Sequence, residues 1–236
     1  MWDFEQGEVL AFDKPLRWTS FDLVAKVRYN LCRKLGKKKL KVGHSGTLDP
    51  LATGVVIVCT GKKTKLIESL QYDVKEYVAT MQLGATTPSY DMEKEVDATY
   101  PTEHITRALV DETIPQFLGE QWQVPPMFSA VQINGKRAYE LARKGQAVEL
   151  KPKLLKIDEI EVLSFDEKAM LLTIRVVCSK GTYIRALARD IGERLHSGAY
   201  LTALRRTRVG DTRVEDCLTI ERFLEQLNEI EYVQNE

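Results

Sequence analysis

Apolar residues along the chain alternate or run together in several short segments that predict β-strands. EVLAFDKP (8–15) alternates weakly and ends at Pro15, which is typical of a strand that runs into a turn. GVVIVCTG (54–61) is a continuous β-branched run bounded by glycines, so it predicts a strand buried on both faces. KEYVATMQLG (75–84) alternates, and the segments 153–165 and 170–184 predict a pair of long strands.

Helical spacing of apolar residues separates these strands. TSFDLVAKVRYNLCRKLG (19–36) begins at Thr19 or Ser20 as a cap and closes at Gly36, with apolar residues on one helical face. Segment 105–119 has a helical pattern that Pro115 interrupts. A helix directly follows the last long strand, and LTIERFLEQLNEI (218–230) predicts a final amphipathic helix.

Together these elements predict an α+β fold with a mixed, largely antiparallel central sheet flanked by helices. We expect a single catalytic domain over residues 1–236, with an insertion at about 123–152. That insertion combines several prolines, a turn at Asn134-Gly135 and a short helix over 137–145, which is typical of a hairpin-like excursion from the core.

Composition is that of a soluble globular protein, because hydrophobic residues make up 44% of the chain and charged residues 29%. No apolar run approaches the ~20 residues of a membrane helix, and the acidic, mixed N-terminus does not resemble a signal peptide. The four cysteines form no C-x-x-C pair, which favours reduced thiols in a cytoplasmic protein, and the three scattered histidines argue against a structural metal site.

The formal net charge of zero hides strong charge segregation along the chain. Residues 33–65 hold nine Lys or Arg and one acid, Asp49, whereas residues 89–121 hold eight acids against two basic residues. The basic run is either a solvated helix end and loop or part of a surface that binds nucleic acid. Sequence alone leaves both possibilities open.

Asp49 lies in the glycine-rich loop GHSGTLDPLATG (43–54). Pro50 stiffens the bend and restricts Asp49 to extended conformations, so the loop either presents a reactive carboxylate or forms an ordinary Asx turn. Glycosidase chemistry usually needs two carboxylates, and the loop is not a P-loop for phosphoryl transfer. A lone carboxylate suits nucleophilic attack, or proton abstraction during a rearrangement.

A second candidate site lies at the strand-to-helix junction CSKGTYIRALARDIG (178–192). Arg185 can hold a carboxylate ionised through a bidentate pair, or it can be an ordinary helix arginine. Tyr77 and Tyr183 are either buried core tyrosines or aromatic faces on which a base stacks, an interaction worth ~1–3 kcal/mol per base.

Five blocks of the sequence resemble the TruB family of tRNA pseudouridine synthases, in the family's order and over nearly the whole chain. The blocks are GHSGTLDPLATGVVIVCTGKKTK, KEYVATMQLGATTPSYD, VPPMFSAVQINGKRAYELARKG, CSKGTYIRALARDIG and YLTALRRTRVG. The resemblance implies the pseudouridine synthase fold and the isomerisation of uridine 55 in the T-loop of tRNA.

The resemblance also implies roles for individual residues. Asp49 matches the catalytic aspartate, Arg185 the arginine that pairs with it, and Tyr77 the aromatic ring that stacks on the target base. His44 matches the histidine that helps to open the T-loop. Tyr183 and Leu204 match positions that line the uridine pocket, and Lys65 matches a basic position beside the site.

An isomerisation needs neither water nor an external donor, so we expect no cofactor, no metal and one carboxylate. The expected partner is the T-arm of tRNA, with no membrane, no obligatory protein partner and a monomeric state. We find no room for the C-terminal PUA-type module of many family members, so the insertion must bear more of the RNA binding. The alternative function is a tRNA-binding folding helper with secondary or lost catalysis.

Overall fold

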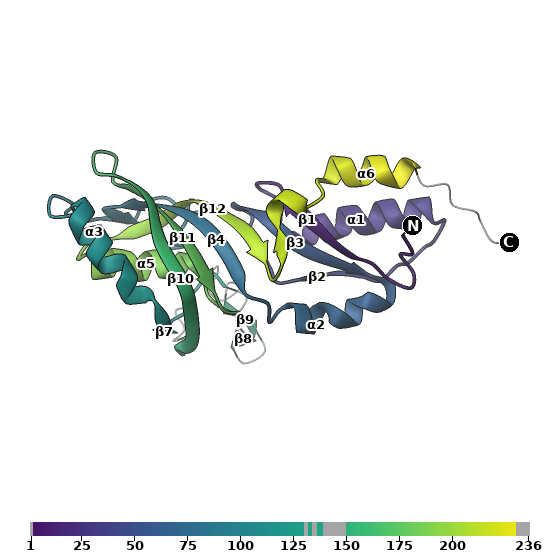
Figure 1. Ribbon diagram of the computed structural model, residues 1–236, viewed down its shortest axis with the longest axis horizontal. Helices are drawn as coiled ribbons and strands as arrows, with labels where there is room; N and C mark the ends of the chain where they lie inside the picture. The colour runs from purple at the N-terminus through teal and green to yellow at the C-terminus, as the bar shows by residue number, and fades with distance from the viewer. Residues whose placement is uncertain (1, 130–131, 134–135, 139–149, 230–236) are drawn as a thin grey trace. The chain divides into compact units, whose positions relative to one another are not determined.

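The structure is a computed structural model that describes residues 2–129, 132–133, 136–138 and 150–229 (Figure 1). Contacts between residues divide the chain into two compact units. Unit 1 joins residues 1–75 to residues 205–236, and unit 2 comprises residues 76–204. The helices and strands of both units confirm the predicted α+β class. That the two units act as a single catalytic domain stays a prediction.

Unit 1 contains a small sheet in which β3 pairs antiparallel with β1 and with β2 and also pairs with β12. A further short strand, β13, pairs with β12. The elements of this unit are β1 (Val9–Lys14), α1 (Ser20–Lys34), β2 (Val42–Ser45), β3 (Ala52–Thr60), η1 (Gly61–Leu66), α2 (Ile67–Leu70), β12 (Ala199–Val209, which begins in unit 2), β13 (Thr212–Arg213), η3 (Val214–Asp216) and α6 (Ile220–Glu229).

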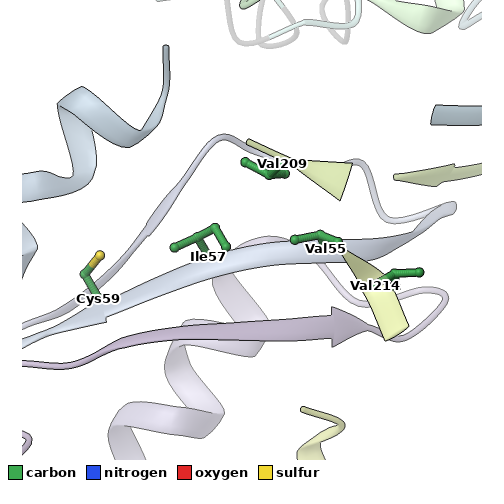
Figure 2. Packing of buried hydrophobic residues seen from close by; sticks show 5 residues of the cluster. All are labelled: Val55, Ile57, Cys59, Val209 and Val214. Atoms are coloured by element: carbon green, nitrogen blue, oxygen red, sulfur yellow. The ribbon is translucent and has the colours of Figure 1, made fainter. Parts of the chain in front are cut away.

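Strand β3 is buried on both faces, as its continuous apolar run predicts. On one face Val55, Ile57 and Cys59 pack with residues of β12 and η3, and Figure 2 shows this cluster. On the other face Val56 is the cross-strand partner of Phe12, whose ring meets Phe223 of α6 edge-on at 5.3 Å. Burial of each such side chain stabilises the fold by about 1.5–3 kcal/mol, so β3 is a firm support for the loop that precedes it.

Helix α1 begins where the sequence predicts. Thr19 is the N-cap, and its hydroxyl oxygen accepts a hydrogen bond from the Asp22 backbone N–H at 2.9 Å. The Asp22 carboxylate accepts a bond in return from the Thr19 N–H at 2.8 Å. This reciprocal capping box contributes about 1 kcal/mol and fixes the point at which the preceding turn enters the helix.

Unit 2 contains a sheet in the order β12-β4-β11-β10-β7, in which β10 pairs antiparallel with β11 and with β7, and short two-stranded ladders occur besides it. Its further elements are β4 (Lys75–Leu83), β5 (Ala85–Thr86), β6 (Ala98–Thr99), α3 (Arg107–Thr113), η2 (Ile114–Phe117), β7 (Gly119–Gln123), β8 (Gln132–Ile133), β9 (Lys136–Arg137), β10 (Lys153–Asp166), β11 (Leu171–Cys178) and α5 (Ile184–Arg194).

Three sequence predictions for unit 2 are confirmed. The two long strands, β10 and β11, pair with each other over Ile157–Asp166 and Leu171–Cys178. The α-helical pattern of segment 105–119 ends at Thr113, and a 3₁₀ turn with Pro115 in its first turn follows. Within the insertion, β8 pairs with β9 as in a hairpin, whereas most of the helix expected over 137–145 lies outside the described residues.

In the part of the chain that the structure describes, no helix is both long enough and apolar enough to cross a bilayer.

Candidate functional site

Asp49 lies in unit 1, in the bend between β2 and β3, and its side chain is partly exposed. The bend is closed through the main chain, because the Ala52 N–H donates to the Asp49 carbonyl at 3.0 Å. Gly46 takes a positive φ of 76°, a conformation that favours glycine. The turn bond does not use the Asp49 carboxylate, so the bend presents an acidic side chain on a rigid backbone.

The guanidinium of Arg206 anchors this loop from β12. Arg206 is only 2% exposed, and its Nε donates to the Val55 carbonyl at 2.7 Å. Its two terminal nitrogens donate to the carbonyls of Thr47, at 3.4 Å, and Gly46, at 3.2 Å. One buried cation therefore satisfies backbone acceptors of the strand and of the loop, three residues from Asp49.

A turn over residues 15–19 braces the other side of the loop. The Ser20 hydroxyl donates to the Leu48 carbonyl at 3.1 Å and accepts from the Leu48 N–H at 2.9 Å. The turn itself is held by Lys14, whose buried ammonium donates to the carbonyls of Pro15 and Trp18. The pKa of Lys14 is lowered to about 8, chiefly by burial and in addition by the Arg206 cation, whereas the Asp49 carboxylate opposes the shift.

This lowered pKa predicts a pH dependence of stability. The unfolded chain keeps the Lys14 proton up to about pH 10.5, whereas the folded chain loses it near pH 8. Below pH 8 both states are protonated, and between these values the unfolded state binds more protons, so the free energy of unfolding rises with pH. Relative to the Lys14→Met variant, the free energy of unfolding of the wild type should rise by up to about 1.4 kcal/mol per pH unit in that window. Urea unfolding of both proteins at several pH values measures this, and a difference that stays constant with pH would contradict it.

His44 lies on β2 of the same unit and is partly buried. Burial and the nearby Arg206 cation lower the pKa of His44, so its imidazole is uncharged at neutral pH. Lys65 lies on η1, after the C-terminal end of β3, whereas Asp49 precedes the N-terminal end. Strand β3 has nine residues, so its two ends lie about 26 Å apart at a rise of 3.3 Å per residue. A position of Lys65 directly beside the carboxylate therefore stays a prediction.

The basic run divides into two groups. Lys37 forms an ion pair with Glu5, Lys63 lies 3.8 Å from Glu8, and Lys62 donates to Gln6, so these lysines hold the N-terminal segment. The side chains of three others, Lys38, Lys39 and Lys41, are exposed to solvent. Some cations of the run are therefore structural and others are solvated, and a role of the solvated ones in nucleic-acid binding stays a prediction.

Arg185 lies in unit 2, in the first turn of α5, and is 5% exposed. Its terminal nitrogens donate to the carbonyls of Ser89, at 3.3 Å, and Phe128, at 2.9 Å, and its Nε lies 3.7 Å from the Asp91 carboxylate. Asp91 is itself buried and accepts from the Ser89 hydroxyl at 2.6 Å. Arg185 therefore joins the 87–91 loop to the base of the insertion.

Sequence reasoning did not single out Asp91, which it counted only among the eight acids of residues 89–121. The signal was present, because Asp91 ends the block KEYVATMQLGATTPSYD, on which part of the family resemblance rests. The pairing of Arg185 with Asp49 connects residues of different units and stays a prediction.

The other predicted site residues of unit 2 lie on strands and at a helix end. Gln123 holds the backbone of Tyr183, accepting from its N–H at 2.9 Å and donating to its carbonyl at 3.2 Å. Tyr77 lies on β4 and is 8% exposed, and Leu204 lies on β12 and is partly buried. The structure thus groups Asp49, His44 and Lys65 in unit 1, and Tyr77, Tyr183, Arg185 and Leu204 in unit 2.

A cavity of 360 Å³ in unit 2 is a separate feature. It is lined by residues of η2, β7, β10 and α5, among them Trp122, Asp190 and Arg194. Burial raises the pKa of Asp190. None of the predicted site residues lines this cavity, so we assign it no part in the site.

Comparison with known proteins gives full-length matches. The family model "TruB family pseudouridylate synthase (N terminal domain)" matches residues 33–184, and "tRNA pseudouridylate synthase B C-terminal domain" matches residues 185–235. The tRNA pseudouridine synthase B of Phocaeicola vulgatus is 67% identical over 99% of this chain and 100% of its own. The protein of that name from Bacteroides thetaiotaomicron is 66% identical over 99% and 98%.

Solved structures also match over nearly the whole chain. A chain of a Cbf5-Nop10-Gar1 complex shares 28% identity with a TM-score of 0.70, over 97% of this chain and 58% of that one. A chain of an H/ACA RNP bound to a substrate RNA containing 2′-deoxyuridine shares 27% identity with a TM-score of 0.68, over 97% and 57%.

Proposed function

Because the chain belongs to the TruB family of pseudouridylate synthases, we propose that it isomerises uridine 55 in the T-loop of tRNA, with Asp49 as the catalytic carboxylate. The observation that carries this proposal is the full-length similarity to proteins named tRNA pseudouridine synthase B. The presentation of Asp49 on a braced, glycine-rich bend supports the assignment of the carboxylate.

The reaction accounts for a single carboxylate in this loop. The bond between N1 of uracil and C1′ of ribose breaks, the base turns, and a bond forms between C5 and C1′. The proton on C5 leaves and N1 gains a proton, so neither a reductant nor a second substrate is needed. Asp49 acts as nucleophile or as base in this sequence, with the cations Lys14 and Arg206 beside its loop.

The remaining site residues receive the roles that the family resemblance implies. Tyr77 stacks on the everted base, which offsets part of the few kcal/mol that base flipping costs. Tyr183 and Leu204 line the uridine pocket, and Arg185 compensates the charge of Asp49. His44, uncharged at neutral pH, helps to open the T-loop, and Lys65 supplies a positive charge beside the site.

We further propose that the enzyme works in the cytoplasm as a monomer without a cofactor. The insertion over 123–152 contributes to RNA binding in this proposal. Lys151 and Lys153, at the C-terminal end of this segment, are exposed and offer charge for phosphates.

Release of the C5 proton gives a direct test. Unmodified tRNA carrying tritium at C5 of uridine is incubated with the purified protein in buffer containing a metal chelator. We expect release of one tritium per tRNA over many turnovers. Tight tRNA binding without tritium release would instead favour the folding-helper alternative.

Tyr77 can be tested separately because its side chain is buried. Tyr77→Phe keeps the aromatic face, so we expect activity within a few fold of wild type. Tyr77→Leu keeps an apolar side chain but loses the face, so we expect at least a tenfold loss of turnover, with a stability cost of about 1–2 kcal/mol. Tritium release and urea unfolding measure the two effects. Equal activity of Phe and Leu variants, with stability loss in both, would favour a purely structural tyrosine.

A further inference from the structure

We infer that Arg17 binds a phosphate of the RNA beside Asp49, as a positioning residue of this chain; the inference rests on the proposed function. Arg17 lies at the tip of the 15–19 turn, and its side chain is exposed. Its backbone N–H donates to the Pro50 carbonyl at 2.7 Å. Pro50, which directly follows Asp49, is therefore hydrogen-bonded to the backbone of Arg17.

The backbone of Arg17 is in an unfavourable conformation for an arginine. Its φ is +67°, in the left-handed region that glycine adopts freely and that costs stability for other residues. The bond to Pro50 explains why the turn needs this conformation. The bond does not explain why residue 17 is an arginine, because glycine or asparagine would make the same backbone bond with less strain.

For the other described non-glycine residues with positive φ, burial or a helix end accounts for the residue at that position. Tyr90 and Met170 are partly buried, and His196 follows the last turn of α5, where a left-handed residue commonly ends a helix. Arg17 follows no helix, unlike His196, and it is more exposed than Tyr90 and Met170. Within the described ranges its guanidinium forms no hydrogen bond, ion pair or ring contact, and it is exposed.

The surroundings fix the position of the turn that carries Arg17. The buried Lys14 holds the turn through two carbonyls, and the Ser20–Leu48 bonds hold the turn to the loop. A uridine that reaches Asp49 brings a phosphate on each side of its ribose. A long guanidinium next to the bend suits bidentate binding of one of these phosphates, and strain kept at such a point is typical of a functional residue.

Arg17→Asn separates RNA binding from folding, because asparagine tolerates the left-handed region without the charge. We expect an unchanged or higher melting temperature, an unchanged kcat and a three- to tenfold higher KM for tRNA at low salt. The slope of log K against log salt should shrink by about 1, the loss of one phosphate contact. Arg17→Lys should restore most of the slope. The matched control is Arg222→Gln, which alters an exposed arginine of α6 in the same unit and should leave KM and slope unchanged.

The outcomes distinguish this inference from the proposed function. No pseudouridine formation by the wild type would overturn both. An active wild type with the same KM and salt slope in Arg17→Asn would overturn the role of Arg17 alone. A lower melting temperature together with a lower kcat in Arg17→Asn would assign the residue to folding and reject the phosphate contact.

Discussion

Asp49→Asn is expected to abolish pseudouridine formation while leaving tRNA binding intact. Asparagine has the shape of aspartate and accepts the bend before Pro50, but it is neither an effective nucleophile nor a base. Removal of an essential catalytic group typically lowers turnover by at least ~10⁴-fold. Loss of a negative charge also reduces repulsion of the phosphate backbone, so affinity should stay equal or rise slightly.

Tritium release under single-turnover conditions and a filter-binding titration measure the two quantities. Asp211→Asn is the matched control, because it removes an exposed acid from the same unit, in the turn between β12 and β13. The control should keep both turnover and affinity. Substantial turnover by Asp49→Asn would reject this carboxylate as the catalytic group.

Arg206→Met is expected to cause the largest loss of stability and a large loss of activity. Methionine fills a similar space but leaves the carbonyls of Val55, Thr47 and Gly46 without their donors. The bond to Val55 is buried and the other two are partly buried. A buried acceptor left unsatisfied costs roughly 1–3 kcal/mol and a partly buried one less, so we expect the free energy of unfolding to fall by about 3–5 kcal/mol. The loop also loses its anchor, and a displacement near 1 Å at a catalytic group can cost about 100-fold in rate.

A neighbouring arginine offers a control for this variant. Arg205 has a side chain that is 41% exposed and pairs with Asp13 at 2.7 Å. Because the pair is partly solvated, Arg205→Met should cost no more than about 1 kcal/mol. Urea unfolding of both variants, with tritium release at a temperature where both are folded, makes the comparison. Equal destabilisation by the two changes would contradict a special role for the buried guanidinium.

Local patterns predicted the elements that position the catalytic bend. The β-branched run of β3 requires burial on both faces, and the Thr19–Asp22 spacing defines a capping box, so each element is specified by residues close in sequence. The glycines and Pro50 likewise identify the bend itself. The family blocks then selected Asp49 from among the 34 acidic residues of the chain.

Long-range contacts were beyond the reach of such patterns. Arg206 reaches backbone carbonyls about 150–160 residues away, and nothing in its own segment distinguishes it from the half-exposed Arg205 beside it. Asp91 meets Arg185 across 94 positions, and nothing in its own acidic segment distinguishes it from the neighbouring acids. The left-handed backbone of Arg17 depends on a bond to Pro50, which no periodicity reveals.

Chemical mapping of pseudouridine in unmodified tRNA after incubation with the purified wild-type protein tests the central claim most directly. The account predicts one modified nucleotide, uridine 55 of the T-loop, at near-stoichiometric level and without added metal or cofactor. Modification at another nucleotide would contradict the substrate assignment, and the absence of pseudouridine from every position would contradict the proposed reaction itself.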